Sequence, residues 1–254
     1  RQLTQELEPR FPMPETPYMI AVRHENGMPL LITSAEIEPA HRPNYPYLVL
    51  AAIPYQAQDN GLPAQGELSR VAKLEESLTH ALKDCRALHL GHVTHNGIFL
   101  VAHYAMRPAP DSVTIPTGFL KKSAIDLNVR KDPDWSWFTA SMEPTPLERV
   151  AHRNQPLYEV LTQHGNRPEL PRPVDFTFFF KSPEGCQAAA DKLSADGFRQ
   201  SQQDIWESDG SYGIELVREM ATLPEEMDPL CVQLDKVAEE LGGEFDGWAC
   251  PVKK

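Results

Sequence analysis

The sequence predicts an α+β protein of two domains, on the evidence of its length, its charge distribution and a proline-rich break. The chain has 254 residues, which is long for one domain. Residues 172–254 carry 8 basic and 17 acidic side chains, a net charge of −9, whereas residues 1–171 have a net charge of −3. The segment NRPELPRP, with three prolines, is typical of a linker. We therefore expect a tail at residues 1–16, a domain at 17–165, a linker at 166–173 and a second domain at 174–254.

Net charge, apolar runs and cysteine spacing each argue against particular classes of protein. The net charge of −12 has the wrong sign for holding phosphates, so we expect no direct nucleic-acid binding. No apolar run is long enough for a membrane helix. The four cysteines are scattered without a CxxC motif, which favours free thiols in a reducing cytoplasm. The sequence begins with Arg rather than Met, so we expect the native start to be missing.

The first domain is predicted to contain two hairpins, a buried strand and an amphipathic helix. Asn26-Gly27 and Asn96-Gly97 each lie between apolar runs and favour the left-handed backbone angles of a tight turn. In GELSRVAKLEESLTHALKDC, apolar residues recur every three or four positions, as on one face of a helix. The expected elements are hairpins over 18–33 and 89–104, a strand over 45–55, a helix over 66–85, a strand ending near Val129, and two helical stretches separated around Pro144 and Pro146.

The second domain is predicted to be ferredoxin-like, an antiparallel sheet with two helices on one face. Ser182 is a candidate N-cap before Pro183, and Gly197 ends that helix. Right-handed crossovers give the sheet order 4-1-3-2, with VDFTFFFK inside and EFDGWAC on an edge. The expected β-α-β-β-α-β elements are strand 174–181, helix 182–197, strands 198–208 and 211–220, helix 223–243 and strand 244–252.

Four histidines on one predicted hairpin, His89, His92, His95 and His103, raise the possibility of a metal site. If Asn96-Gly97 is a two-residue turn, alternation puts His89 and His95 on one face and His92 and His103 on the other. Zinc needs three or four converging ligands, so we expect no metal. There is also no GxSxG elbow, no close Cys–His pair and no Gly-rich phosphate loop. We therefore expect no cofactor and no catalytic residue.

The chain resembles two known families. Its acidic β-α-β-β-α-β plan and the ending Phe245-Asp246-Gly247-Trp248 make residues 174–254 similar to the RraB family, the regulator of ribonuclease E activity B. The strand YPYLVLAAIPY and the segments GLPAQGEL, GHVTHNG and DPDWSWF make residues 17–165 similar to the domain of unknown function 695 family, which occurs fused to RraB-like domains. The sequence departs from the RraB pattern in having Ala249-Cys250 after the Trp, where a Gly often follows.

The RraB resemblance implies a small acidic protein that binds ribonuclease E and lowers its activity without catalysis of its own. Alternation along the last strand puts Asp246 and Trp248 opposite Phe245, so Trp248 would join Phe179 on the open face of the sheet. There it is a candidate docking anchor, because Trp is enriched in binding hot spots. The other candidate partner-binding residues are Glu244 and Asp246 beside it and Asp204, Glu207 and Asp209 near the predicted hairpin turn.

The sequence is compatible with three functions. The first is a cytoplasmic, non-catalytic inhibitor or modulator of a ribonuclease E-like endonuclease, whose −9 domain imitates the phosphate field of RNA. The second is a regulatory or structural interaction module with an unrelated protein partner. A third is an enzyme that acts through the histidine-bearing hairpin. Neither the oligomeric state nor the role of the first domain follows from the sequence.

Overall fold

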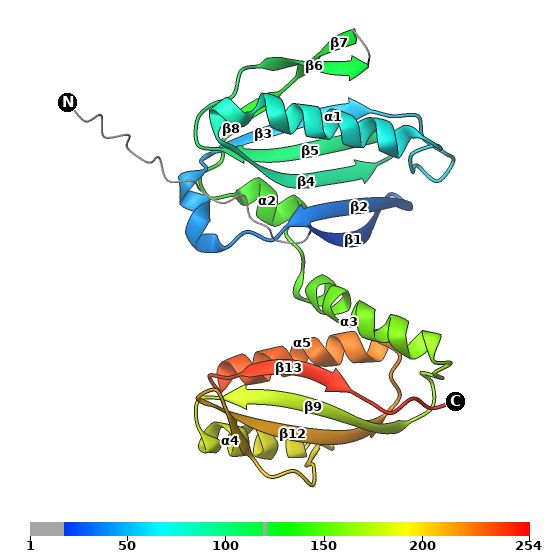
Figure 1. Ribbon diagram of the computed structural model, residues 1–254, viewed down its shortest axis with the longest axis vertical. Coiled ribbons are helices and arrows are strands. Elements are labelled where there is room, and N and C mark those ends of the chain that lie inside the picture. The colour runs from blue at the N-terminus through cyan, green and yellow to red at the C-terminus, as the bar shows by residue number, and fades with distance from the viewer. Residues whose placement is uncertain (1–17, 119–120) are drawn as a thin grey trace, which may run out of the picture. The chain divides into compact units, whose positions relative to one another are not determined.

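The computed structural model describes residues 18–118 and 121–254 (Figure 1). The chain divides into two compact units, Arg1–Pro144 (unit 1) and Thr145–Lys254 (unit 2). Both units mix helices with antiparallel sheet, which confirms the predicted α+β class and the two-domain plan. The tail predicted at residues 1–16 lies outside the described residues.

Unit 1 is built on a six-stranded antiparallel sheet with the order β1-β2-β4-β5-β3-β8. The Asn26-Gly27 and Asn96-Gly97 pairs both have positive φ angles and form the predicted two-residue hairpin turns. A separate two-stranded sheet was not predicted and consists of β6 and β7. The strands are β1 (Tyr18–Glu25), β2 (Met28–Ala35), β3 (Tyr47–Pro54), β4 (Ala87–His95), β5 (Ile98–Ala105), β6 (Ser112–Gly118), β7 (Lys121–Asp126) and β8 (Asn128–Lys131).

Two apolar cores lie on the two faces of this sheet. Helix α1 (Glu67–Ala81) covers one face, where Val71, Leu74 and Leu78 pack against β3 and β5. Helix α2 (Ser136–Ser141) covers the other, where Trp135, Phe138 and Met142 are buried. Short 3-10 helices η1 (Pro39–Asn44) and η2 (Lys83–Cys85) complete the unit. Figure 1 shows α1 lying along β3, β5 and β4, away from β1.

Unit 2 has the predicted ferredoxin-like sheet, with the strand order β10-β12-β9-β13 and β11 paired to β12. This is the predicted order 4-1-3-2, with the last strand on an edge and the phenylalanine-rich strand inside. Phe176, Phe178 and Phe180 are buried against helices α4 (Pro183–Ser194) and α5 (Pro224–Glu240), which lie on the same side of the strands (Figure 1). The strands are β9 (Arg172–Phe180), β10 (Arg199–Gln200), β11 (Trp206–Ser208), β12 (Ser211–Met220) and β13 (Glu244–Ala249).

The helices of unit 2 begin where the sequence predicts. Ser182 caps α4 (Pro183–Ser194) by accepting from the backbone N–H of Gly185, and Pro183 occupies the first position. Helix α3 (Pro146–Gln163) starts with a capping box in which Thr145 and Glu148 bond each other's backbone, a stabilising arrangement at a helix start. Helix α5 (Pro224–Glu240) carries Met227, Cys231 and Leu234 on its buried face.

The domain boundary is a correction to the sequence prediction. The chain divides before Thr145 rather than at 166–173, because α3 places Val150 and Leu161 in the core of unit 2. The expected linker is also anchored within unit 2. The backbone N–H of Arg167 donates to the carbonyl of Lys253 at 2.7 Å, and that of Thr222 donates to the carbonyl of Pro168 at 2.8 Å. The ferredoxin-like sheet therefore carries an additional N-terminal helix.

Candidate functional site

A β-bulge in β4 gathers three histidines on one face of unit 1. Gly91 has a φ of +118°, and a Cβ there would lie 1.9 Å from the carbonyl oxygen of Thr33, so only glycine fits. The pairing with β5 shifts between His89 and Gly91, so that His89 lies opposite His103. His89 and His103 therefore share a face with His92, toward α1. The predicted division of two histidines per face is wrong, since a bulge reverses the alternation.

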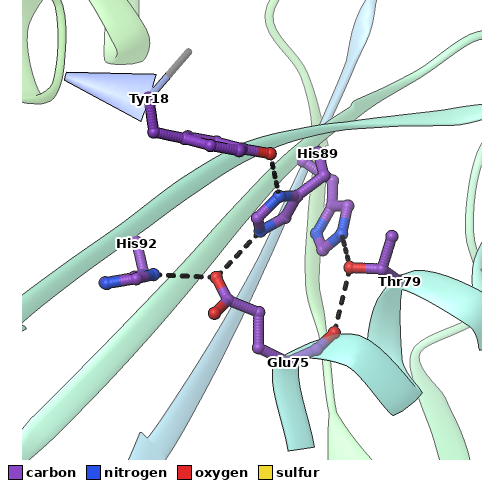
Figure 2. A network of polar contacts seen from close by, with 6 residues as sticks. Tyr18, Glu75, Thr79, His89 and His92 are labelled. Atoms are coloured by element: carbon purple, nitrogen blue, oxygen red, sulfur yellow. Dashed lines mark hydrogen bonds and ion pairs between the residues drawn. The ribbon is translucent and has the colours of Figure 1, made fainter. Parts of the chain in front are cut away.

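Glu75 on α1 is the centre of a polar network on this face (Figure 2). Its Oε1 accepts a hydrogen bond from Nε2 of His89 and another from Nδ1 of His92, both at 2.8 Å. The other ring nitrogen of His89, Nδ1, forms a hydrogen bond with the hydroxyl of Tyr18 at 2.6 Å. Helix α1 and strand β4 thus meet at one carboxylate, and Tyr18 of β1 is linked to it through His89.

The network sets the protonation state of its members. Burial raises the pKa of Glu75, but the hydrogen bonds from His89 and His92 outweigh burial and lower it to about 2. Burial also raises the pKa of the Tyr18 hydroxyl, and the charge of Glu75 raises it further. Glu75 is therefore a carboxylate and Tyr18 a neutral phenol, so Tyr18 is poorly suited to act as a nucleophile.

His103 lies behind the network and is fully buried. The Thr79 hydroxyl donates to the carbonyl of Glu75 at 2.9 Å and accepts from Nε2 of His103 at 3.0 Å. Burial lowers the pKa of His103 to about 3, with a smaller contribution from neighbouring His89. Across residues 18–118 and 121–254, no group of three or more His, Cys, Asp or Glu side chains has the arrangement of a metal site. The geometry supports a satisfied network that ties α1 to the sheet.

A second bulge determines where Trp248 points in unit 2. Gly247 has a φ of +143°, and the pairing of β13 with β9 shifts between Phe245 and Gly247. Phe245 and Trp248 consequently both face the helices and are buried, whereas Asp246 is exposed. The predicted exposed position of Trp248 beside Phe179 is wrong. The Asp-Gly pair before the Trp acts as the bulge that turns its side chain into the core.

Trp248 belongs to a buried polar chain linking α3, α5 and β13. Its indole N–H donates to Oδ1 of Asn154 at 3.1 Å, and the amide of Asn154 donates to Oδ1 of Asp228 at 2.7 Å. The hydroxyl of Tyr158 donates to the same oxygen at 2.7 Å. Burial and the acceptor Asp228 raise the pKa of Tyr158. Sequence reasoning missed Asn154, Tyr158 and Asp228, although the spacing of the first two places them on one face of a helix.

The sheet face opposite the helices carries the aromatic pair Phe179 and Trp206. Their ring centroids lie 6.0 Å apart in an edge-on arrangement. The ring of Trp206 covers Gly213, where an added Cβ would lie 2.2 Å from the indole. Phe179 is on the predicted face, but its aromatic neighbour is Trp206 rather than Trp248. We call the set Asp175, Thr177, Phe179, Trp206, Gly213, Glu215 and Glu244 the open face.

Carboxylates surround this aromatic pair. Glu244 pairs with Phe179 across the strands, and Glu215 pairs with Thr177. Asp175 is half-buried, and its burial together with the charge of Glu215 raises its pKa. Among the described residues neither Asp175 nor Glu215 forms an ion pair.

The remaining predicted site residues lie at the β11–β12 end of the sheet. Asp204, Glu207 and Asp209 are all exposed, and Asp209-Gly210 forms the turn of that hairpin. The structure therefore brings together Phe179, Glu244 and Trp206, and places the three hairpin carboxylates along the neighbouring edge. It does not bring Trp248 to that surface.

These features define the chain as an α+β domain followed by an acidic ferredoxin-like domain whose sheet carries Phe179 and Trp206 on the face opposite helices α4 and α5. Residues 151–250 match the family described as regulator of ribonuclease activity B, and residues 20–141 match a family of unknown function, DUF695. Unit 2 thus contains an RraB domain and unit 1 a DUF695 domain, as the resemblances predict. No curated protein matches the chain. Within the described residues, no helix has the length and apolar content to cross a membrane.

Proposed function

We propose that this chain binds a ribonuclease E-like endonuclease in the cytoplasm through the open face of unit 2 and lowers its activity without a catalytic step of its own. The RraB match supports regulation of a ribonuclease as the general role. The specific partner, the direction of the effect and the surface are our inference. The choice of surface rests on two carboxylates, Asp175 and Glu215, that form no ion pair among the described residues. They lie on the same sheet face as the aromatic pair Phe179 and Trp206.

Two carboxylates on neighbouring strands repel each other, and half-burial adds to the cost of their charges. An arginine or lysine from a partner would relieve this repulsion. The adjacent Trp206 and Phe179 would provide an apolar anchor, because aromatic side chains concentrate binding energy. Endonucleases that hold RNA present clustered basic residues, which matches the net charge of −9 in residues 172–254.

The exposed carboxylates Asp204, Glu207 and Asp209 have a different expected role. They lie at the rim of this surface, where charges steer a partner and fix orientation more than they hold it. We expect their neutralisation to slow association and flatten the salt dependence. Asp246 is exposed on β13 and belongs to the same rim.

The experiment is a binding titration of the full chain against a purified ribonuclease E-like endonuclease. We expect Trp206→Ala to weaken binding by about 2 kcal/mol, roughly thirtyfold. Glu215→Gln should also weaken binding while slightly stabilising the free chain, because it removes the repulsion with Asp175. The matched controls are Trp137→Ala, a half-buried Trp of unit 1, and Glu239→Gln, an exposed carboxylate of α5.

Binding that is unaffected by Trp206→Ala and by Glu215→Gln would exclude this surface. Absence of binding by the wild-type chain would exclude the partner and favour an unrelated protein partner instead. Circular dichroism of each variant separates lost binding from lost folding.

A further inference from the structure

Among the residues that the structure describes, strand β1 forms one edge of the unit 1 sheet. Within the described part of the chain it pairs only with β2. Tyr18, Ile20 and Val22 are 43%, 64% and 58% exposed and occupy alternate positions on the strand. Edge strands normally carry a proline, a bulge or an inward-pointing charge that blocks further pairing. From Tyr18 to Val22 this strand has none of these features.

The backbone of β1 presents its hydrogen-bonding groups at the same positions. A two-residue turn at Asn26-Gly27 makes Glu25 and Met28 the first hydrogen-bonded pair of the hairpin. Hydrogen-bonded pairs alternate along an antiparallel ladder, so Arg23, Ala21 and Met19 also bond to β2. The N–H and C=O groups of Tyr18, Ile20 and Val22 therefore point away from β2.

Charge indicates what would cover this edge. The hairpin 18–35 contains one Arg and one Glu, so its net charge is zero, and the acidic excess of the chain lies in unit 2. A strongly charged partner would find no complementary charge along β1. A second copy of the same neutral strand matches it.

We propose that two copies of this chain pair antiparallel through their β1 strands, which joins the two unit 1 sheets into one. In the register centred on Ala21, Ile20 lies opposite Val22 of the partner subunit and Tyr18 lies opposite His24 of the partner subunit. Arg23 then lies opposite Met19 of the partner subunit, so no like charges face each other. Each copy presents the same patch to the other, as a two-fold interface requires.

The test is the molar mass of the full chain in solution, measured by light scattering and sedimentation across a wide concentration series. We expect a reversible dimer whose dissociation constant rises at least tenfold in Val22→Lys. Leu68→Lys is the matched control, because Leu68 is also 57% exposed but lies on α1, and it should leave the dimer unchanged.

A second variant distinguishes backbone pairing of the β1 strands from non-specific hydrophobic association. Val22→Pro removes an N–H that points away from β2, so it should abolish the dimer while the hairpin stays folded. Hydrogen exchange of the Ile20 and Val22 amides should become slower as concentration rises. A wild-type chain that is monomeric throughout, or a dimer that survives both Val22 variants, would overturn the proposal.

Discussion

Each unit has a polar network centred on one carboxylate, which joins α1 to the sheet in unit 1 and joins α5 to α3 in unit 2. Glu75 in unit 1 accepts from the imidazole N–H groups of His89 and His92. Asp228 in unit 2 accepts from the amide of Asn154 and the phenol of Tyr158, which stay neutral over the physiological pH range. Behind the unit 1 network lies the buried His103, which bonds the hydroxyl of Thr79 next to the backbone carbonyl of Glu75. Burial lowers the pKa of His103 to about 3, so this histidine makes the attachment of α1 to the sheet sensitive to acid.

The largest expected effect is on the Asp228 side of this comparison. Trp248→Ala should destabilise unit 2 by about 3–5 kcal/mol, because it leaves a cavity under α3 and removes the indole donor from Asn154. Trp206→Ala, on the open face, should cost less than half as much. Hydrogen exchange read by mass spectrometry reports each unit separately. Equal losses for the two variants would mean that Trp248 is not the core residue described here.

Acid should affect unit 1 more than unit 2. His103 has a pKa of about 3 in the folded chain, below its usual value of 6.5, so unfolding takes up a proton between these values. The stability that this residue contributes is present above pH 6.5 and is lost as pH falls toward 3. Between pH 6.5 and 5 we expect unit 1 to lose on the order of 2 kcal/mol.

The control for this effect is His103→Gln, which keeps a donor for Thr79 but cannot take up the proton. The variant should be less stable at neutral pH and should have a flatter pH profile in the same window. If unit 2 loses as much stability as unit 1 between pH 6.5 and 5, the contrast between the two networks is wrong.

The smallest effect should come from exchanging each carboxylate for its amide. Glu75→Gln and Asp228→Asn both keep an oxygen that accepts two hydrogen bonds, so each should cost about 1 kcal/mol. Because Glu75 has a lowered pKa of about 2, its contribution is present above about pH 4.5 and is lost as pH falls toward 2. Denaturant unfolding at about pH 4.5 and about pH 2.5 should show that Glu75→Gln removes this additional acid sensitivity.

Sequence reasoning predicted the α+β class, the ferredoxin-like strand order and most elements, because periodicity and turn residues report local structure. The two wrong predictions of side-chain direction, for the histidines of β4 and for Trp248 of β13, share one physical cause. Gly91 and Gly247 each form a bulge, and one extra residue in a strand sends every later side chain to the other face. The sequence did indicate both bulges, because a lone glycine inside a strand pattern is typical of a bulge.

The misplaced domain boundary has a different cause. Residues 166–173 contain three prolines, yet several of their backbone groups bond to unit 2, and α3 packs there through Val150 and Leu161. Proline content reports local backbone preference and not which core a neighbouring helix joins. The Thr145–Glu148 capping box marked where α3 begins but not where it packs.

The most direct test of the central claim is the rate of RNA cleavage by a ribonuclease E-like endonuclease as the full chain is added. We predict that the wild-type chain and Trp137→Ala slow cleavage to the same limit, and that Trp206→Ala needs roughly thirtyfold more protein to do so. A cleavage rate that stays constant up to saturating wild-type chain, or that falls equally with Trp206→Ala, would contradict the account.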